Sequence, residues 1–340
     1  MQSDDATSAV LGSVGVAEDR IATVAPLAGG TFNAVTRVTL TDGSDWVVKI
    51  PPPTTDGALM SYERDLLVNE VEFYTCAGES AAVPRVLHSE LDPAAPTGPY
   101  VIMSACPGQP WCDIAGGAAD RVMSDTEERR LRNELGRIVA RLHSITGPGG
   151  FGYPARALGP LSPTWRQAFT AMTEAVLGDA DTYRARLPRP TAGIRTLLAA
   201  ASPVLDDVTR PALVHFDLWQ GNLLVDGEPG ARTIGGIVDG ERMFWGDPVA
   251  DFVSLALFAN MEEDEDFLAG YGDGSGQPVV FDASVRLRLA LYRCYLYLIM
   301  LVETVPRRVP QEHLDRTWKE VGPQLESALE DVESALRARN

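Results

Sequence analysis

The spacing of apolar residues divides the chain into a strand-rich first third and a mainly helical remainder. Short apolar or alternating runs bounded by Gly and Pro are typical of strands. Such runs predict strands at residues 21–40, with a turn at Gly29-Gly30, and at residues 46–50, 83–91 and 100–105. Three prolines directly after Ile50 should end the second of these segments, because proline cannot donate to a strand ladder.

Helical spacing dominates the rest. Residues 125–144 place apolar side chains on one face of a helix, with Ser124 as N-cap and Glu127 at the capping-box position. Residues 61–79 predict another helix, for which Gly78 is a C-cap. A short helix is expected within the first twenty residues. The segment 287–303 predicts a buried helix, in which three tyrosines belong to the core or, alternatively, line a pocket for a planar substrate.

This change of pattern near residue 105 predicts an α+β protein with two lobes. The expected N-terminal lobe spans residues 1–105, of which 1–20 are an additional segment, and the C-terminal lobe spans residues 106–340. A length of 340 residues is sufficient for two such lobes, each with its own core.

Composition is that of an ordinary globular protein, with 45 % hydrophobic and 22 % charged residues. The longest apolar run, at residues 287–302, contains Arg288 and Arg293, so we expect no membrane span. The N-terminus has two aspartates and lacks the layout of a signal peptide, which predicts a cytoplasmic protein. A net charge of −18 disfavours nucleic acid as a partner. The four cysteines form no CxxC pair, which argues against structural zinc.

The densest group of chemically useful residues lies between Leu213 and Phe252. His215 and Asp217 are followed by Asn222, and a second apolar strand then leads to Asp239. One carboxylate can accept a hydroxyl proton, while an amide oxygen and a second carboxylate are suitable ligands for Mg²⁺. An HxDxxxxN loop followed by an aspartate after the next strand therefore indicates phosphoryl transfer.

These motifs, HFDLWQGN and IVDGERMFWGDPVAD, resemble those of the aminoglycoside phosphotransferase and choline kinase family over about residues 25 to 300. The resemblance implies a bilobal fold like that of protein kinases, with a small strand-rich N-lobe and a larger helical C-lobe. Phe216 stands where that family often has glycine, and Trp219 is closer to its sugar-kinase-like branches.

The resemblance implies a role for each residue of the motifs. Asp217 is the expected catalytic base, and Asn222 and Asp239 are the expected ligands of Mg²⁺. His215 is expected to support the loop from a buried position. Asp247 and Asp251 are expected to stabilise it structurally.

Upstream, Lys49 matches the strand lysine that contacts the α- and β-phosphates of ATP or GTP in that family. The chain contains only one other lysine, Lys319, so a lysine within an apolar strand suggests a specific need for an ammonium group. Glu70 is the expected partner of Lys49. Glu63 and Glu72 are the alternatives on the same predicted helix, and Glu63 would share the face of Glu70.

The nucleotide should also contact the turn between the first two strands. Gly29 and Gly30 permit close approach of the backbone to phosphates, and Thr31 or Asn33 could add a side-chain donor, although a Gly-Gly pair is also an ordinary hairpin turn.

At the position of the hinge between the lobes, the resemblance implies that backbone groups of Ser104 and Cys106 bind the adenine.

The expected reaction transfers the γ-phosphate of ATP or GTP to a hydroxyl group of a small molecule. An aminoglycoside-like or other antibiotic is the first choice of acceptor, and a choline-like or sugar metabolite is the alternative. A nucleotide-binding protein without catalysis is a third hypothesis. The acidic run at residues 262–266 would suit a polycationic acceptor, but it equally fits a solvated loop or the start of a helix.

Overall fold

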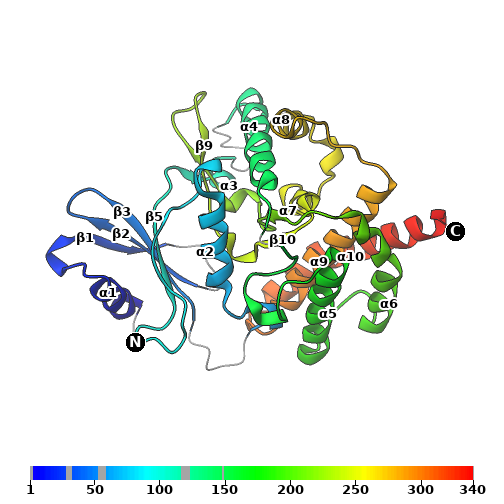
Figure 1. The fold of residues 1–340 in the computed structure, drawn as a ribbon, viewed down its shortest axis with the longest axis horizontal. Coiled ribbons are helices and arrows are strands. Elements are labelled where there is room, and N and C mark those ends of the chain that lie inside the picture. Colours follow the sequence, from blue (N-terminus) through cyan, green and yellow to red (C-terminus); the bar gives the residue numbers. More distant parts are fainter. Residues whose placement is uncertain (1–2, 28–32, 53–58, 116–122, 148, 340) are drawn as a thin grey trace.

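An antiparallel five-stranded sheet forms one end of the molecule, and helices form most of the remainder (Figure 1). The computed structural model describes residues 3–27, 33–52, 59–115, 123–147 and 149–339. The order of strands in the sheet is β1-β2-β3-β5-β4. Their bounds, which confirm the predicted strands, are β1 Ile21–Pro26, β2 Ala34–Leu40, β3 Asp45–Ile50, β4 Val86–Glu90 and β5 Tyr100–Ser104.

One face of this sheet is covered by the N-terminal helix α1 (Ser3–Ser13), as predicted for the first twenty residues. Val10 and Leu11 of α1 are 1 % exposed and pack with Val38 and Leu40, which share one face of β2. Burial of each side chain of this size stabilises the folded state by about 1.5–3 kcal/mol. The alternation along β2 therefore directs its apolar side chains toward α1.

The helix expected over residues 61–79 is shorter in the structure. A 3₁₀ turn at Ser61–Glu63 comes first, and Asp65 then adopts a left-handed conformation with φ of 60°. The helix α2 therefore runs over Leu66–Ala77 and ends at Gly78, the predicted C-cap. Its start is set by this backbone break, which the apolar spacing does not report.

The helix α4 (Asp125–Ser144) matches its predicted bounds, and the Ser124 hydroxyl accepts the N–H of Glu127 as an N-cap. The Glu127 carboxylate, however, does not form the expected capping box. It accepts the backbone N–H groups of Gly230 (2.7 Å) and Arg232 (3.2 Å) and pairs with the Arg232 guanidinium at 3.1 Å. These buried tertiary partners hold the start of α4 against the segment before β9.

Short strands in the helical part carry the loops of the candidate site. Two of them form one ladder and three form another. Their bounds are β7 Ala212–Val214 with β10 Phe244–Gly246, and β6 Gln109–Pro110 with β8 Leu223–Asp226 and β9 Thr233–Ile237. The expected boundary between lobes near residue 105 stays a prediction.

The remaining helices form most of the part of the molecule that lies away from the five-stranded sheet (Figure 1). They are α3 Trp111–Ala115, α5 Trp165–Tyr183, α6 Thr191–Ala201, α7 Asp251–Leu255, α8 Glu265–Ser275, α9 Ala283–Val302 and α10 Gln311–Arg339. In the described ranges, no helix is both long enough and apolar enough to span a membrane.

The predicted core helix is α9, whose tyrosines are buried. The Tyr292 hydroxyl accepts from the Trp165 indole N–H at 2.7 Å and donates to Asp247 Oδ2 at 2.7 Å. The hydroxyls of Tyr295 and Tyr153 share a hydrogen bond of 2.9 Å. Tyr297 is 3 % exposed. Each of the first two rings thus satisfies its polar tip inside the core, so these tyrosines are structural.

Helices α4 and α8 lie side by side (Figure 1) and approach each other through glycines. A Cβ atom at Gly270 would lie 1.9 Å from the Asn133 carbonyl oxygen, and one at Gly136 would lie 2.2 Å from the Phe267 carbonyl oxygen. Both distances are far below a van der Waals contact. This close backbone approach therefore requires glycine at both positions.

We expect Gly270→Ala to destabilise the protein by about 1–3 kcal/mol, because the added methyl group must push two helix backbones apart. Gly178→Ala in α5 is the matched control, since a Cβ there meets no atom within 4 Å. The control should stabilise the protein by about 0.5–1 kcal/mol, because alanine loses less entropy in a helix. Thermal unfolding of both variants tests this. Equal melting temperatures would show that the helices separate without cost.

Candidate active site

The loop between β7 and β8 is held by one buried carboxylate. Asp251, at the start of α7, accepts the backbone N–H of His215 at 3.1 Å and of Phe216 at 2.5 Å. His143 of α4 approaches the same carboxylate with its Nε2 at 2.9 Å. Asp251 is fully buried, so these contacts fix the loop rigidly to the helical core. This is the structural role expected of Asp251.

Phe216 adopts a left-handed backbone with φ of 63°, a conformation that favours glycine. Its ring is fully buried and packs against Phe244 and Tyr295, with centroid separations of 5.0 and 5.5 Å. Burial of a phenylalanine contributes about 1.5–3 kcal/mol, which offsets backbone strain of about 1–3 kcal/mol. This explains why a bulky residue occupies a position where glycine is common in the resembled family.

Asp217 follows Phe216 and projects toward the remaining charged residues. Its backbone N–H donates to His215 Nδ1 at 3.2 Å, and its carbonyl accepts from Asn222 Nδ2 at 2.9 Å. The side chain is 21 % exposed, and Arg242 Nε lies 3.8 Å from its Oδ2 atom. Burial raises the pKa of the Asp217 carboxyl to about 6, although Arg242 opposes this shift. The group can therefore gain and lose a proton near neutral pH.

Asn222 and Asp239 are brought to the same side by the hairpin of β8 and β9. The Val238 N–H donates to the Asn222 carbonyl at 3.0 Å. Because the Asn222 side-chain N–H group points at the loop, its amide oxygen can coordinate a cation. Asp239 has a left-handed φ of 64°, and its N–H donates to the Tyr74 hydroxyl at 2.9 Å.

Lys49 of β3 is the centre of the charge cluster. Its Nζ lies 2.5 Å from Asp239 Oδ1, 2.8 Å from Glu241 Oε2 and 2.9 Å from Glu70 Oε2. Burial alone would lower the pKa of Lys49, but these carboxylates raise it well above its usual value, so the ammonium stays charged. The charge of Lys49 in turn lowers the pKa of Asp239 against the effect of burial. The Lys49 side chain thus connects the sheet with α2 and with the segment after β9.

Glu70 of α2 is the helix glutamate that reaches Lys49, as the sequence predicted. It is 1 % exposed, and burial raises its pKa to about 7 in spite of Lys49. The Tyr74 hydroxyl, which accepts from Asp239, donates to Glu70 Oε1 at 3.0 Å. The alternative, Glu63, lies before α2 and pairs with Arg307 at 2.5 Å. Tyr74 thus links Glu70 and Asp239, two of the three partners of Lys49.

Two residues of this cluster had no role in the sequence prediction. Glu241 and Arg242 lie on a 3₁₀ turn, Gly240–Arg242, directly after Asp239. The Glu241 carboxylate also accepts from Asn33 Nδ2 at 2.6 Å. The signal in the sequence was a second acid two residues after Asp239, but only the turn brings it back to Lys49.

The expected nucleotide contacts are only partly described. Gly29, Gly30 and Thr31 lie outside the residues that the structure describes. The Ser104 N–H donates to the Arg85 carbonyl at 2.9 Å, so a contact of Ser104 with the adenine would have to use its carbonyl, and this role stays a prediction. Burial raises the pKa of the Cys106 thiol to about 11, which keeps it neutral. A backbone role of Cys106 stays a prediction.

The acidic run at residues 262–266 spans the end of a 3₁₀ turn (Met261–Glu263), the N-cap Asp264 and the first residues of α8. Asp264 accepts the N–H of Phe267 as an N-cap and pairs with Arg132 through Nε at 2.7 Å. Glu262 pairs with Arg286 at 2.7 Å. These arginines occupy carboxylates that a cationic acceptor would need. The run therefore fits the helix-start interpretation better than a cation site.

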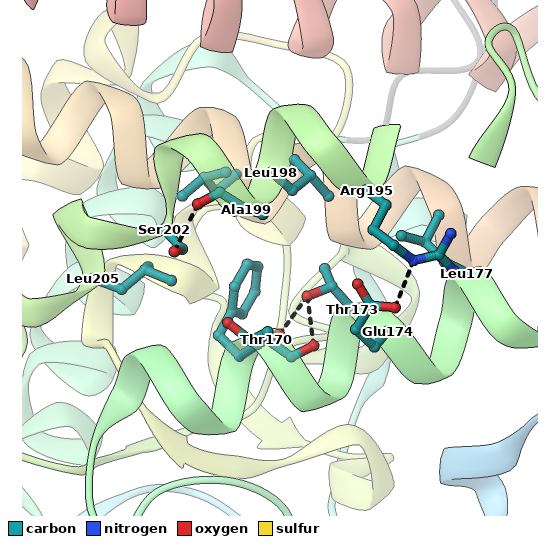
Figure 2. Close-up of a pocket in the computed structure, with 11 residues that line it drawn as sticks. Thr170, Thr173, Glu174, Leu177, Arg195, Leu198, Ala199, Ser202 and Leu205 are labelled. Carbon is teal, nitrogen blue, oxygen red and sulfur yellow. Dashed lines mark hydrogen bonds and ion pairs between the residues drawn. The ribbon is translucent and has the colours of Figure 1, made fainter. Parts of the chain in front are cut away.

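A separate hollow lies between α5 and α6, away from these residues (Figure 2). Its lining includes Thr173 and the ion pair of Glu174 with Arg195, whose Oε2 and Nε atoms are 2.7 Å apart. None of the candidate residues lines it. The hollow therefore takes no part in the chemistry of Asp217 and the Lys49 cluster.

Solved structures that resemble this chain have kinase-like folds. A fructosamine-3-kinase homologue from Thermobifida fusca shares 20 % identity and a TM-score of 0.60, with 93 % of this chain and 94 % of that chain covered. An aminoglycoside phosphotransferase, APH(4)-Ia, in complex with ADP and hygromycin B shares 16 % identity and a TM-score of 0.58, with 97 % of each chain covered. The choline kinase LicA from Streptococcus pneumoniae shares 14 % identity and a TM-score of 0.62, with 98 % and 100 % covered.

These similarities confirm the predicted bilobal, protein-kinase-like fold, since identities at this level report the fold alone. No curated protein sequence matches the chain significantly. The model of the phosphotransferase enzyme family matches residues 23–291, which include the Lys49 cluster and the loop of Asp217. The chain belongs to the phosphotransferase enzyme family.

Proposed function

We propose that this phosphotransferase moves the γ-phosphate of ATP or GTP to a hydroxyl group of a small molecule. The observation that supports this best is the convergence of Lys49, Glu70 and Asp239, with Asp217 and Asn222 on the adjoining loop. A nucleotide-binding protein without catalysis would not need a partly exposed carboxylate whose pKa lies near neutrality.

Asp217 is the proposed base. It would accept the proton of the acceptor hydroxyl as that oxygen attacks the γ-phosphorus and the bond to the β-phosphate oxygen breaks. Asn222 and Asp251 hold the loop, so the carboxylate is fixed before the acceptor arrives. A rigid position of this kind lowers the entropic cost of the reaction.

The residues present fit Mg²⁺. Lys49 faces three carboxylates, which leaves an excess of negative charge for a cation to balance. Mg²⁺ usually binds one or two protein carboxylates together with substrate phosphates, and the Asp239 carboxylate and the Asn222 amide oxygen would hold it. When bound, the ion would neutralise phosphate charge. Lys49, released from Asp239 in part, would contact the α- and β-phosphates while Glu70 keeps it in place.

The acceptor is proposed at the level of its reacting group. A hydroxylated antibiotic is the first candidate, since a similar structure holds hygromycin B, and a choline-like or sugar metabolite is the second. A screen for nucleoside diphosphate release over both classes, with ATP and with GTP, tests the function. If no compound of either class caused release of the nucleoside diphosphate, the proposal would be contradicted.

Asp217→Asn should lower turnover by about 10²–10⁴-fold, because it removes the base and keeps the shape of the side chain. Binding of the Mg²⁺-nucleotide should persist. Asp239→Asn should weaken both binding and turnover, because it removes a charged metal ligand. Calorimetry beside a turnover assay separates the two variants. Full turnover in Asp217→Asn would exclude this loop from catalysis.

The rate should depend on pH through Asp217. Because its pKa is raised to about 6 and the base must be deprotonated, kcat/KM for the acceptor should fall below pH 6 and level off above it. Arg242→Gln removes the cation that opposes this shift, so its acid limb should move to higher pH. A pH profile of kcat/KM, recorded for the wild-type protein and for the variant, measures the acid limb of each. A wild-type limb near pH 4 would contradict the assignment.

Lys49→Ala should lower turnover by about 10²-fold or more, because the phosphates lose a fixed cation. Lys319→Ala is a matched control, since Lys319 is the other lysine of the chain and lies exposed on α10. The control should behave like the unmodified protein in turnover and in thermal unfolding. Equal turnover in both variants would remove Lys49 from the site.

A further inference from the structure

A chain of alternating charges lies beside Asp217. Arg242, 3.8 Å from Asp217, pairs through Nη2 with Glu303 Oε2 at 2.8 Å. Glu303, at the end of α9, is also 3.2 Å from Arg307, which pairs with Glu63 at 2.5 Å. These residues come from three distant segments, so the fold itself assembles the cluster.

The carboxylates of this cluster are already neutralised. Glu63 has no exposed side-chain surface, and the side chain of Glu303 is 15 % exposed and shared by two arginines. An ammonium group on an acceptor would have to compete with guanidinium groups that are held by the fold. The cluster thus offers little to a polycation, as does the acidic run at the start of α8.

Arg242 itself has capacity for a ligand. Its ion pairs use Nε and Nη2, and within the described residues its Nη1 donates to no other group. The guanidinium is 13 % exposed, and its pKa is raised well above its usual value by nearby acids despite burial, so it is always charged. A guanidinium only donates hydrogen bonds.

A second polar group beside Arg242 lacks a partner. The Tyr62 hydroxyl is buried, and among the described residues it forms no hydrogen bond. Its ring stacks on Tyr153 at a centroid separation of 5.7 Å. Burial raises the pKa of Tyr62 well above its usual value, although the Arg242 charge opposes this, so the hydroxyl stays protonated. An unsatisfied buried hydroxyl indicates a place that a ligand or a water molecule completes.

We propose that Arg242 selects the acceptor: the group next to the phosphorylated hydroxyl is an oxygen acceptor, a second hydroxyl or a carboxylate, and not an ammonium. This inference rests on the proposed function and narrows its candidates to sugar-like and other non-cationic acceptors, at the expense of choline-like and aminoglycoside-like ones. An oxygen there accepts from Arg242 Nη1, whereas an ammonium also only donates and carries a like charge. The selected acceptors are neutral or anionic polyhydroxyl compounds.

Matched trios of compounds test the proposal. Glucose, glucosamine and glucuronic acid form one trio, and galactose, galactosamine and galacturonic acid form a second. The amine replaces the hydroxyl at C2 and the carboxylate replaces the hydroxymethyl group at C6, so each is compared with its parent sugar. Each is assayed for nucleoside diphosphate release and for thermal stabilisation of the Mg²⁺-nucleotide complex. We expect kcat/KM to be about tenfold or more higher for the hydroxyl and carboxylate members than for the amine. The same two members should raise the melting temperature of the Mg²⁺-nucleotide complex more than the amine does.

The variants assign this preference to one side chain. Arg242→Gln should reduce the preference to near equality, and Arg242→Lys, which keeps the charge, should retain most of it. Arg293→Gln is the control, because Arg293 pairs with Asp331 on the surface, and it should keep the full preference. Melting temperatures confirm that each variant is folded.

Preference for the amine members would overturn the selection by Arg242 while leaving a working phosphotransferase. Trios whose members are indistinguishable in both assays, or a preference that persists in Arg242→Gln, would overturn it too. A different outcome is that no compound causes diphosphate release, while the hydroxyl and carboxylate members still stabilise the protein more than the amine. This would count against the proposed function but support the selection by Arg242.

Discussion

The buried ammonium group of Lys49 is the interaction on which the site depends. It is 5 % exposed and lies within 2.9 Å of carboxylates from α2 and from the segment after β9. Removing one partner of such a buried group typically costs about 3–5 kcal/mol, because a charge is left uncompensated. The five-stranded sheet is therefore held against the helical part by the same atoms that the proposed chemistry uses, and binding and lobe arrangement cannot vary independently.

Two residues of the same site have a strained backbone. Phe216 and Asp239 both have left-handed φ angles, and each stands next to a residue of the proposed reaction or belongs to it. The Asp251 carboxylate stabilises the first by accepting the N–H groups of His215 and Phe216, and the Tyr74 hydroxyl stabilises the second by accepting those of Asp239 and Gly240. Strain at functional sites persists only where the surroundings overdetermine the conformation, and the hydrogen bonds from α7 and α2 supply this here.

Local patterns were enough to predict the strands and the bounds of α4, and the family resemblance predicted the pairing of Lys49 with Glu70. They were insufficient wherever a residue's partner lies far along the chain. The Glu127 carboxylate turns to Arg232 because a buried acid needs a counter-ion more than α4 needs a capping box. Arg242 meets Glu303 only because the turn after β9 faces the end of α9. The spacing of residues predicts which face of a helix or strand a side chain occupies, but its tertiary partners depend on how distant segments pack together.

The scarcity of lysine has a practical consequence for labelling. Lys49 lies beneath three carboxylates, whereas Lys319 is exposed on α10. A reagent that acylates amines needs the neutral, accessible form, and the raised pKa of Lys49 denies it this form. Among lysine side chains, a dye or a surface linker will therefore attach at Lys319. Single-molecule and surface-capture experiments can use that attachment without modifying the charge cluster.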